Sequence, residues 1–206
     1  MRFNSIKNVL DKKYKILPLR GLWSEVLGEP EASGIWLIYG LEKMGKTTIS
    51  LLLADELSEA KRTGYIMAEQ GFDKDFQDVL NRLSIPFKKR NLRFAEYIPI
   101  SELSDLLKKK NQPDILFMDN LTIYADELRN GGLRKLIKDH PNKLFIMLAH
   151  EEKGEPYTAT AKLAKKLAKR ILHVEGNTAT VEGRGPGGTI VIDEDRAQLY
   201  HGTIKD

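Results

Sequence analysis

The feature that most constrains this chain is a glycine-rich loop that follows the pattern G-x-x-x-x-G-K-[ST]. In such a loop a tight backbone turn points several N–H groups inward at phosphate oxygens. The pattern requires a strand before the loop and a helix after it, so it also fixes local structure. The loop consists of Gly40, Leu41, Glu42, Lys43, Met44, Gly45, Lys46, Thr47 and Thr48.

Each residue type in this P-loop has a physical role in binding phosphate. Gly40 and Gly45 allow the backbone to turn tightly, because glycine has no side chain to clash. Lys46 supplies a mobile positive charge for the terminal phosphates, and Thr47 offers its hydroxyl to Mg²⁺. The N-terminus of the following helix adds partial positive charge. The expected cofactors are therefore ATP and Mg²⁺.

The segments that flank the loop have the character that the motif requires. Residues 35–39 are a continuous apolar run, which is typical of a buried parallel strand. Residues 47–57, after the loop, are apolar enough for a buried helix. Strand, loop and helix therefore occur in the required order, which argues against an incidental glycine turn.

The rest of the chain alternates apolar strands with helices. The expected strands are residues 35–39, 64–68, 92–98, 114–119 and 143–149. The expected helices are residues 46–60, 73–84, 101–110 and 132–139. This alternation predicts an α/β protein with a mostly parallel twisted sheet that is flanked by helices.

The C-terminal part differs and predicts an antiparallel extension on the edge of the sheet. A helix is expected at 159–169, followed by three short strand-like runs, with a hairpin signal at Gly176-Asn177. The runs are residues 170–175, 178–183 and 189–193. We expect residues 1–206 to form a single domain, in which the N-terminal segment 1–34 packs on the core.

Composition excludes several other classes of protein. No apolar run approaches the roughly 18 residues that a membrane-spanning helix needs, and residues 1–5 have no apolar signal core. The absence of cysteine excludes disulfides and thiolate metal sites and is typical of a cytoplasmic protein. The net charge of +4 permits a polyanionic partner without requiring one.

Three polar residues at strand ends extend the predicted site. Residues 115–119 are an apolar strand that ends in Asp119, the Walker B pattern, so Asp119 should meet Thr47 across the metal. Glu69 follows the strand at 64–68 and is well placed as a general base that activates water. His150 ends the strand at 143–149 and can contact the γ-phosphate, although a structural hydrogen bond to a loop explains it equally well.

These motifs resemble those of the RecA-like ATPases, which include recombinases, RadA/Sms repair proteins and DnaB-type ring helicases. The P-loop with Glu42 at its third position resembles that of RecA, and residues 68–73 resemble the stretch with RecA's catalytic glutamate. Residues 150–154 resemble the His-Val-Thr-Lys-Glu-Gly stretch of RadA-type proteins. The resemblance implies a RecA-like core that hydrolyses ATP at a boundary between subunits, with Glu69 as the base and His150 as the γ-phosphate sensor.

The resemblance also implies a positive residue that reaches into a neighbour's site. DnaB and RadA relatives carry Lys-x-Arg on a strand near the C-terminus, and the matching place here is Glu182-Gly183-Arg184. Arg184 is therefore the residue expected to reach into the neighbour's site, while Glu182 stands where the relatives have the lysine. We expect the chain to work as a homo-oligomer or with a protein partner.

The resemblance further implies work on DNA in recombination, repair or helicase-like translocation. The segment from Glu151 to Ala159 is expected to be a flexible loop, which in RecA-like proteins touches single-stranded DNA but here begins with two glutamates. The helix behind it carries a basic face, which suggests either a polyanion groove or an ordinary solvated surface. That face consists of Lys162, Lys165, Lys166, Lys169 and Arg170.

Two other functions are consistent with the P-loop. A small-molecule kinase would need arginines in a lid, for which Arg82, Arg90 and Arg93 are candidates. A nucleotide-dependent switch or adaptor would bind ATP and scarcely hydrolyse it, a hypothesis motivated by Glu182.

Overall fold

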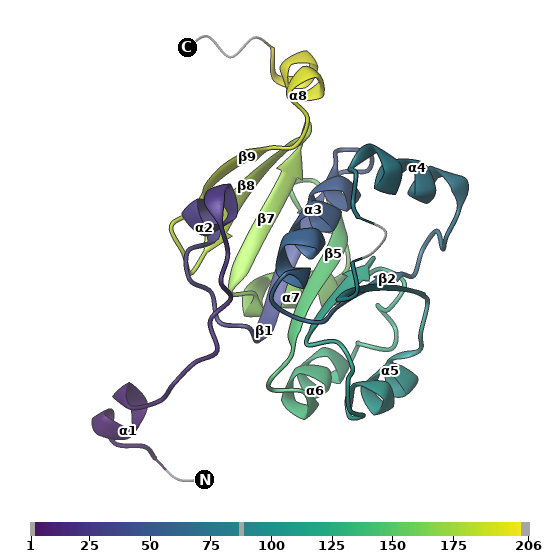
Figure 1. Ribbon diagram of the computed structural model, residues 1–206. Helices are drawn as coiled ribbons and strands as arrows, with labels where there is room; N and C mark the ends of the chain where they lie inside the picture. The colour runs from purple at the N-terminus through teal and green to yellow at the C-terminus, as the bar shows by residue number, and fades with distance from the viewer. Residues whose placement is uncertain (1–2, 87–88, 203–206) are drawn as a thin grey trace.

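A mixed β-sheet runs through the centre of the protein (Figure 1). The computed structural model describes residues 3–86 and 89–202, while residues 1–2, 87–88 and 203–206 lie outside the described part. Within that part the strands follow the order β3-β2-β4-β5-β1-β7-β8-β9, and β6 pairs with β5 beside this path. Strands β3, β2, β4, β5, β1 and β7 are parallel, whereas β8 and β9 are antiparallel.

The predicted fold class is therefore confirmed, including the antiparallel extension on one edge. The strands are β1 (Gly34–Gly40), β2 (Thr63–Met67), β3 (Leu92–Glu96), β4 (Ile115–Asp119), β5 (Leu144–Glu152), β6 (Glu155–Pro156), β7 (Arg170–Glu175), β8 (Thr178–Gly183) and β9 (Gly188–Val191). The helices are α1 (Ile6–Leu10), α2 (Gly21–Leu27), α3 (Lys46–Ser58), α4 (Lys74–Arg82), α5 (Ile100–Leu107), α6 (Gly132–Asp139), α7 (Ala159–Leu167) and α8 (Glu194–His201).

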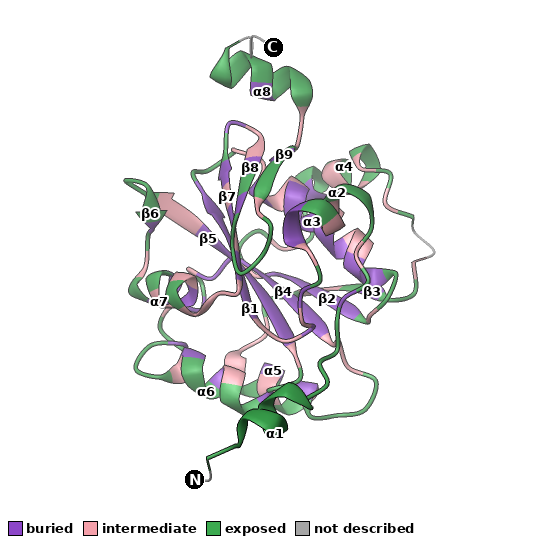
Figure 2. Ribbon diagram, turned by 90° about the vertical axis from the view of Figure 1, so that its left-hand side faces the viewer, coloured by how far each residue is buried: buried purple, intermediate pink, exposed green. Residues whose placement is uncertain are grey.

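The sheet separates two apolar layers, because successive side chains of a strand point to opposite faces. On β1, Trp36 and Ile38 join the layer with α2, α3 and α4, whereas Ile35 and Leu37 join the layer with α5, α6 and α7. The central strands are accordingly buried on both faces (Figure 2). No helix in the described ranges combines the length and the apolar character needed to cross a membrane.

The N-terminal segment divides into two parts. Leu17, Val26 and Leu27 are buried in the layer that contains α3, and Trp23 packs against that layer. By contrast α1 buries none of its residues and lies away from the sheet (Figure 1). Residues from Leu17 onward thus contribute to the apolar core, whereas α1 does not.

Two elements near the C-terminus differ from expectation. Instead of a flexible loop after His150, β5 continues to Glu152 and pairs with β6 through a two-residue turn. Lys153 and Gly154 both have positive φ, 54° and 80°, as a tight hairpin turn of this kind requires. Helix α8 was not predicted because it has no apolar stripe and buries only Ala197.

The end of β1 is crowded, and this crowding explains the first glycine of the P-loop. Gly40 lies between β5 and β7, opposite His150 and Val174. A Cβ atom at Gly40 would lie 2.0 Å from the carbonyl oxygen of Val174. Because that oxygen belongs to the backbone of a central strand, it has no room to move, and only glycine fits here.

We predict that Gly40→Ala lowers the free energy of unfolding by about 3 kcal/mol or more, because the strands must separate to admit the methyl group. The matched control is Gly154→Ala, where φ is 80° and no atom lies within 4 Å of the added Cβ. That change should cost only about 1 kcal/mol of backbone strain. Urea unfolding followed by circular dichroism measures both, and equal losses would contradict the crowding at β1.

Candidate functional site

The carboxyl ends of the parallel strands meet at one edge of the sheet, where the P-loop connects β1 to α3. Gly45 caps the N-terminus of α3 with a left-handed φ of 101°. In the strand register, Gly40 of β1 lies opposite His150 of β5, and Met67 of β2 lies opposite Asp119 of β4. The register therefore brings together residues that are far apart in the sequence.

A cavity of about 580 Å³ opens at this edge, a volume within the usual range of ligand sites. Among its lining residues are nine that the sequence predicted: Glu42, Lys43, Gly45, Lys46, Thr47, Thr48, Glu69, Asp119 and His150. The cavity is also lined by Arg82, which the sequence offered only as a kinase-lid candidate, and by residues to which it gave no role at this site, among them Gln70, Asp75, Asn177 and Arg196. No local motif marks the residues of this second group, because they are scattered over α4, α8 and two loops.

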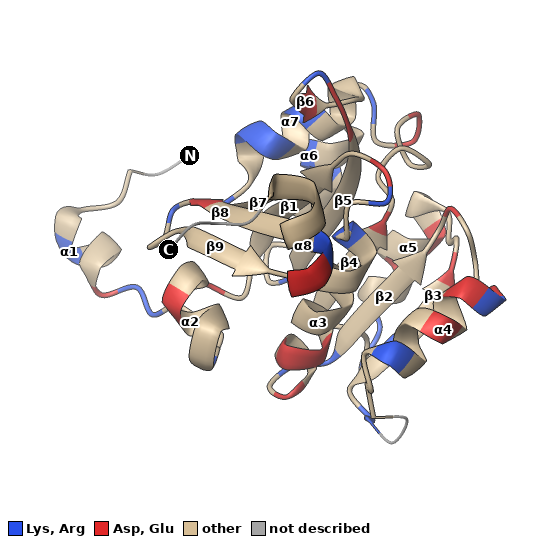
Figure 3. Ribbon diagram, turned by 90° about the horizontal axis from the view of Figure 1, so that it is seen from above, with Lys and Arg blue, Asp and Glu red and all other residues tan. Residues whose placement is uncertain are grey.

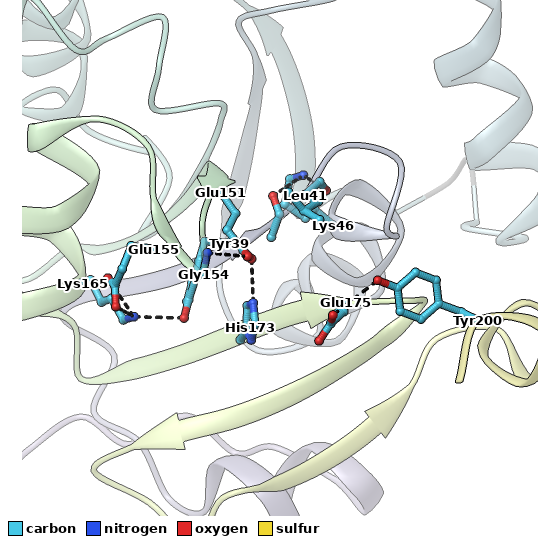
Figure 4. Close-up of polar contacts among 11 residues, drawn as sticks. Tyr39, Leu41, Lys46, Glu151, Gly154, Glu155, Lys165, His173, Glu175 and Tyr200 are labelled. Atoms are coloured by element: carbon cyan, nitrogen blue, oxygen red, sulfur yellow. Dashed lines mark hydrogen bonds and ion pairs between the residues drawn. The ribbon is translucent and has the colours of Figure 1, made fainter. Parts of the chain in front are cut away.

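Lys46 is held against its own loop. It is buried, and its Nζ donates hydrogen bonds to the carbonyl oxygens of Gly40, at 2.9 Å, and Leu41, at 2.6 Å. Figure 4 shows Lys46 beside Leu41. Burial lowers the pKa of the ammonium group, while Asp119 and other carboxylates oppose this shift. The two backbone contacts thus hold the positive charge of Lys46 at the P-loop.

Asp119 is the buried acid of the site. Its Oδ2 accepts hydrogen bonds from the Tyr65 hydroxyl at 2.9 Å and from Thr47 Oγ1 at 3.3 Å. Tyr65 is itself fully buried, and its hydroxyl lies 2.7 Å from Ser50 Oγ on α3. Burial raises the pKa of Asp119 to about 6, with the two hydrogen bonds opposing the rise. The sequence predicted Asp119 and Thr47 as neighbours, but it gave no sign of Tyr65.

The pair Thr47 and Asp119 suits Mg²⁺ in chemistry. A hydroxyl and a carboxylate are hard oxygen donors, and these two lie within hydrogen-bond distance of each other. Mg²⁺ takes one or two protein oxygens and completes its shell with water and phosphate oxygens, so two such donors are enough to hold it.

A second cluster joins the ends of β2, β4 and β5. Asn120, which is 1% exposed, accepts a hydrogen bond at Oδ1 from the backbone N–H of Thr122 at 2.8 Å. This contact turns its Nδ2 toward Glu69 Oε2 and toward His150 Nε2, the latter at 2.7 Å. His150 Nε2 lies 3.3 Å from Glu69 Oε2. Asn120 was not predicted, although its place directly after Asp119 was the available signal.

Arg184 is not at this chain's own site. It is exposed, and its backbone N–H donates to the carbonyl of Lys169 at 2.9 Å. The preceding Gly183 pairs with Arg170, which in turn pairs with Trp36 near the start of β1. Arg184 therefore lies at the edge of the sheet opposite the P-loop.

Two of the five residues predicted for the basic face of the helix do not lie on it. Helix α7 ends at Leu167, so Lys169 lies beyond it and Arg170 begins β7. Arg170 is buried, and its Nε and Nη2 donate to the carbonyl of Leu27 at 3.0 and 2.8 Å.

Two lysines of the predicted set make contacts within the chain. Lys169 pairs with Glu31 at 2.7 Å, and Lys165 contacts Glu155 at 3.1 Å and the Tyr39 hydroxyl at 3.0 Å (Figure 4). Of the predicted set, Lys162 and Lys166 are exposed.

The three arginines proposed for a kinase lid do not converge. Arg82 lines the cavity at the P-loop. Arg90 and Arg93 instead line another cavity, of about 420 Å³, that lies between β2, β3 and α5. The structure thus separates the residues on which the kinase hypothesis depended.

Two solved structures are similar to this chain. The flagellar accessory protein FlaH from Methanocaldococcus jannaschii has 16% identity and a TM-score of 0.62 over 87% of this chain and 92% of its own. A KaiC-like protein from Pyrococcus horikoshii has 13% identity and a TM-score of 0.63 over 86% of this chain and 93% of its own. No protein-family model and no curated protein sequence matches the chain.

Both neighbours are RecA-like P-loop ATPases, and the chain shares their fold, as its motifs predicted. At such low identity the likeness shows the fold alone. A RecA-like fold supports the binding or hydrolysis of ATP.

We predict that Asp119→Asn stabilises the metal-free protein at neutral pH. Asp119 binds its proton more tightly when folded, with a pKa of about 6, than when unfolded, where about 3.9 is usual. Its ionisation therefore costs stability as the pH rises from about 4 through about 6. In EDTA at about pH 7.5 the variant should gain about 1–3 kcal/mol of unfolding free energy. Below about pH 4 the gain should vanish, and a gain that is independent of pH would contradict the assignment.

Proposed function

We propose that the chain is a Mg²⁺-dependent ATP hydrolase that forms a single RecA-like ATPase domain. The observation that carries this proposal is the convergence of two clusters in one cavity at the P-loop. One is the oxygen pair of Thr47 and Asp119, and the other is the pair of Glu69 and His150, which the buried Asn120 joins through hydrogen bonds. A binding site alone would not require a carboxylate that is oriented by a buried amide.

The P-loop supplies the phosphate site. Its backbone N–H groups and the N-terminus of α3 face the phosphates, and phosphate oxygens replace the two carbonyls that Lys46 now contacts. Thr47 and Asp119 would hold Mg²⁺, which supplies charge neutralisation on the phosphates. The rest of the catalytic work falls to side chains of the chain itself.

Glu69 acts as the base in hydrolysis. Water attacks the γ-phosphorus, its proton passes to the Glu69 carboxylate, and the bond from the γ-phosphorus to the bridging oxygen breaks to give ADP and phosphate. Asn120 holds the Glu69 carboxylate in one orientation through its Nδ2. His150, linked to the same amide, contacts the γ-phosphate and reports its loss.

The alternative is a nucleotide-dependent switch or adaptor. Two observations on Arg184 favour it. Arg184 lies away from the cavity, and the residue two positions before it is Glu182, where DnaB and RadA relatives carry a lysine. If Arg184 acts, it acts on a second copy of the chain, so the hydrolase proposal includes a homo-oligomer. A chain without such a contact would bind ATP and turn it over slowly.

We extend the proposal to DNA transactions on narrower grounds, namely the resemblance of the motifs to RecA and the exposed Lys162 and Lys166. Part of the acidic hairpin beside them has partners within the chain. Glu155 forms an ion pair with Lys165, and Glu151 Oε2 lies within hydrogen-bond distance of His173 Nε2, at 2.6 Å (Figure 4).

We predict that wild-type protein hydrolyses ATP with Mg²⁺ and that Lys46→Ala does not. Glu69→Gln should lower kcat by about 100-fold or more, because the general base is lost, yet it should still bind ATP. Steady-state phosphate release and calorimetric ATP binding measure the two properties. Equal slow rates for wild type and Glu69→Gln would favour the switch over the hydrolase.

We predict that single-stranded DNA raises the rate of hydrolysis and that the double variant Lys162→Glu/Lys166→Glu loses this stimulation but keeps the basal rate. The matched control, Lys109→Glu/Lys110→Glu, makes the same change of charge on exposed residues beyond the end of α5. Stimulation should fall as salt rises, since counterion release drives such binding. A rate that is indifferent to DNA, or equal losses in both variants, would contradict a DNA role for α7.

A further inference from the structure

One face of α4 is directed at the nucleotide cavity. Asp75, Val79 and Arg82 all line it, and their spacing of four and three residues places them on the same side of the helix. The helix is held there by Phe76, which is buried and meets Phe94 of β3 edge-on at 5.5 Å. Its N-terminus is capped by Asp73, whose carboxylate accepts the N–H of Phe76 at 2.8 Å. Arg82 therefore projects from an anchored element.

The guanidinium of Arg82 reaches the P-loop itself. Its Nη2 lies 3.5 Å from Oγ1 of Thr48, the residue directly after the expected Mg²⁺ ligand Thr47. An arginine at this position lies within reach of any phosphate chain bound by the loop. The planar guanidinium fork can donate two parallel hydrogen bonds to phosphate oxygens, which a lysine cannot do.

Arg82 differs in its partners from Arg196, the other arginine among the described residues that line the cavity. Arg62 pairs with Asp114 at 3.2 Å, and Arg196, which lines the same cavity from α8, pairs with Asp193 at 3.5 Å. Within residues 3–86 and 89–202, Arg82 makes no ion pair with a carboxylate. Figure 3 shows that α4 and α8, which border the cavity, both carry acidic and basic residues. Arg82, which contacts Thr48, is thus not neutralised by a carboxylate of the described residues.

We propose that Arg82 binds the phosphate chain of ATP in cis and supplies within one chain the positive charge that phosphoryl transfer requires. The inference rests on the proposed function of the P-loop site. It accounts for the position of Arg184 at the opposite edge of the sheet, since a site with its own arginine does not depend on a neighbour. Arg82 is then a catalytic residue, because it touches the substrate.

The first test compares Arg82→Gln with Arg93→Gln, which removes the same charge from the exposed face of β3 at the other cavity. Arg82→Gln should weaken calorimetric binding of MgATP about tenfold to hundredfold, as expected for a lost charged hydrogen bond. It should also lower kcat at saturating ATP at least about tenfold. Arg93→Gln should match wild type in both properties. Equal values for the two variants would overturn the proposal.

The second test asks whether the arginine acts within one chain. Lys46→Ala protein is inactive at its own site but carries intact Arg82 and Arg184. Mixed in excess with Arg82→Gln, it should restore nothing. Restored activity would show that Arg82 acts across a boundary between copies and would overturn its role in cis. A mixture of Lys46→Ala with Arg184→Ala tests separately whether Arg184 of one copy acts at the site of another copy.

Two controls keep these outcomes separable. If wild type fails to exceed the Lys46→Ala blank, the hydrolase proposal fails, while the MgATP affinities still decide the role of Arg82. Thermal unfolding confirms that each variant is folded.

Arg82→Lys serves as a second variant. It keeps the positive charge but lacks the planar guanidinium group, so its MgATP affinity should fall between those of wild type and Arg82→Gln. A lysine variant no weaker than wild type would contradict bidentate contact with phosphate.

Discussion

The parallel pairing of β1, β2, β4 and β5 is the constraint on which the site depends. In a parallel sheet all the strands end at the same edge, so one register fixes the relative positions of Gly40, Asp119 and His150. Close approach at that edge leaves no room for a side chain at Gly40. The close approach that requires glycine at this position therefore also places the start of the P-loop directly beside β5 and β7.

The crowded edge also sets the electrostatics of the site. Lys46 and Asp119 are both buried, and burial disfavours the charged form of each, so the pKa of the lysine falls and that of the aspartate rises. Tyr65 and Thr47 donate hydrogen bonds that partly offset the cost at Asp119. A folded chain that carries unfavourable buried charge gains most from a ligand that neutralises it, as Mg²⁺ with a nucleotide would. Stability and function are thus in opposition at this carboxylate.

If Arg82 acts as proposed, the site is more nearly complete within one chain than the resemblance implies. Arg184 lies at the far edge of the sheet, whereas Arg82 of α4 touches the P-loop. Three of the five cations expected on one basic face are committed to contacts within the chain, with Glu31, Glu155 and the carbonyl of Leu27. Charges that look alike in the sequence therefore differ in what they are free to bind.

The sequence by itself determined the P-loop, the strand that ends in Asp119 and the alternation of strands and helices. These features depend on short-range patterns. A continuous apolar run indicates a strand that is covered on both faces of the sheet, and a tight turn around phosphate requires glycine because a side chain would clash. The sequence could not identify Tyr65 or Asn120, because each acts through a contact with a residue at least 30 positions away. It named Arg82 only as one of three candidates for a kinase lid, because its contact with Thr48 is equally distant in the sequence.

Only the tertiary structure decided which strands are neighbours, where α7 ends and which way the face of α4 points. Those outcomes depend on packing summed over the whole sheet. No local window of the sequence contains that sum. The P-loop and the polar residues at strand ends were therefore predictable, whereas the contacts of Tyr65 and Asn120 that orient them were not.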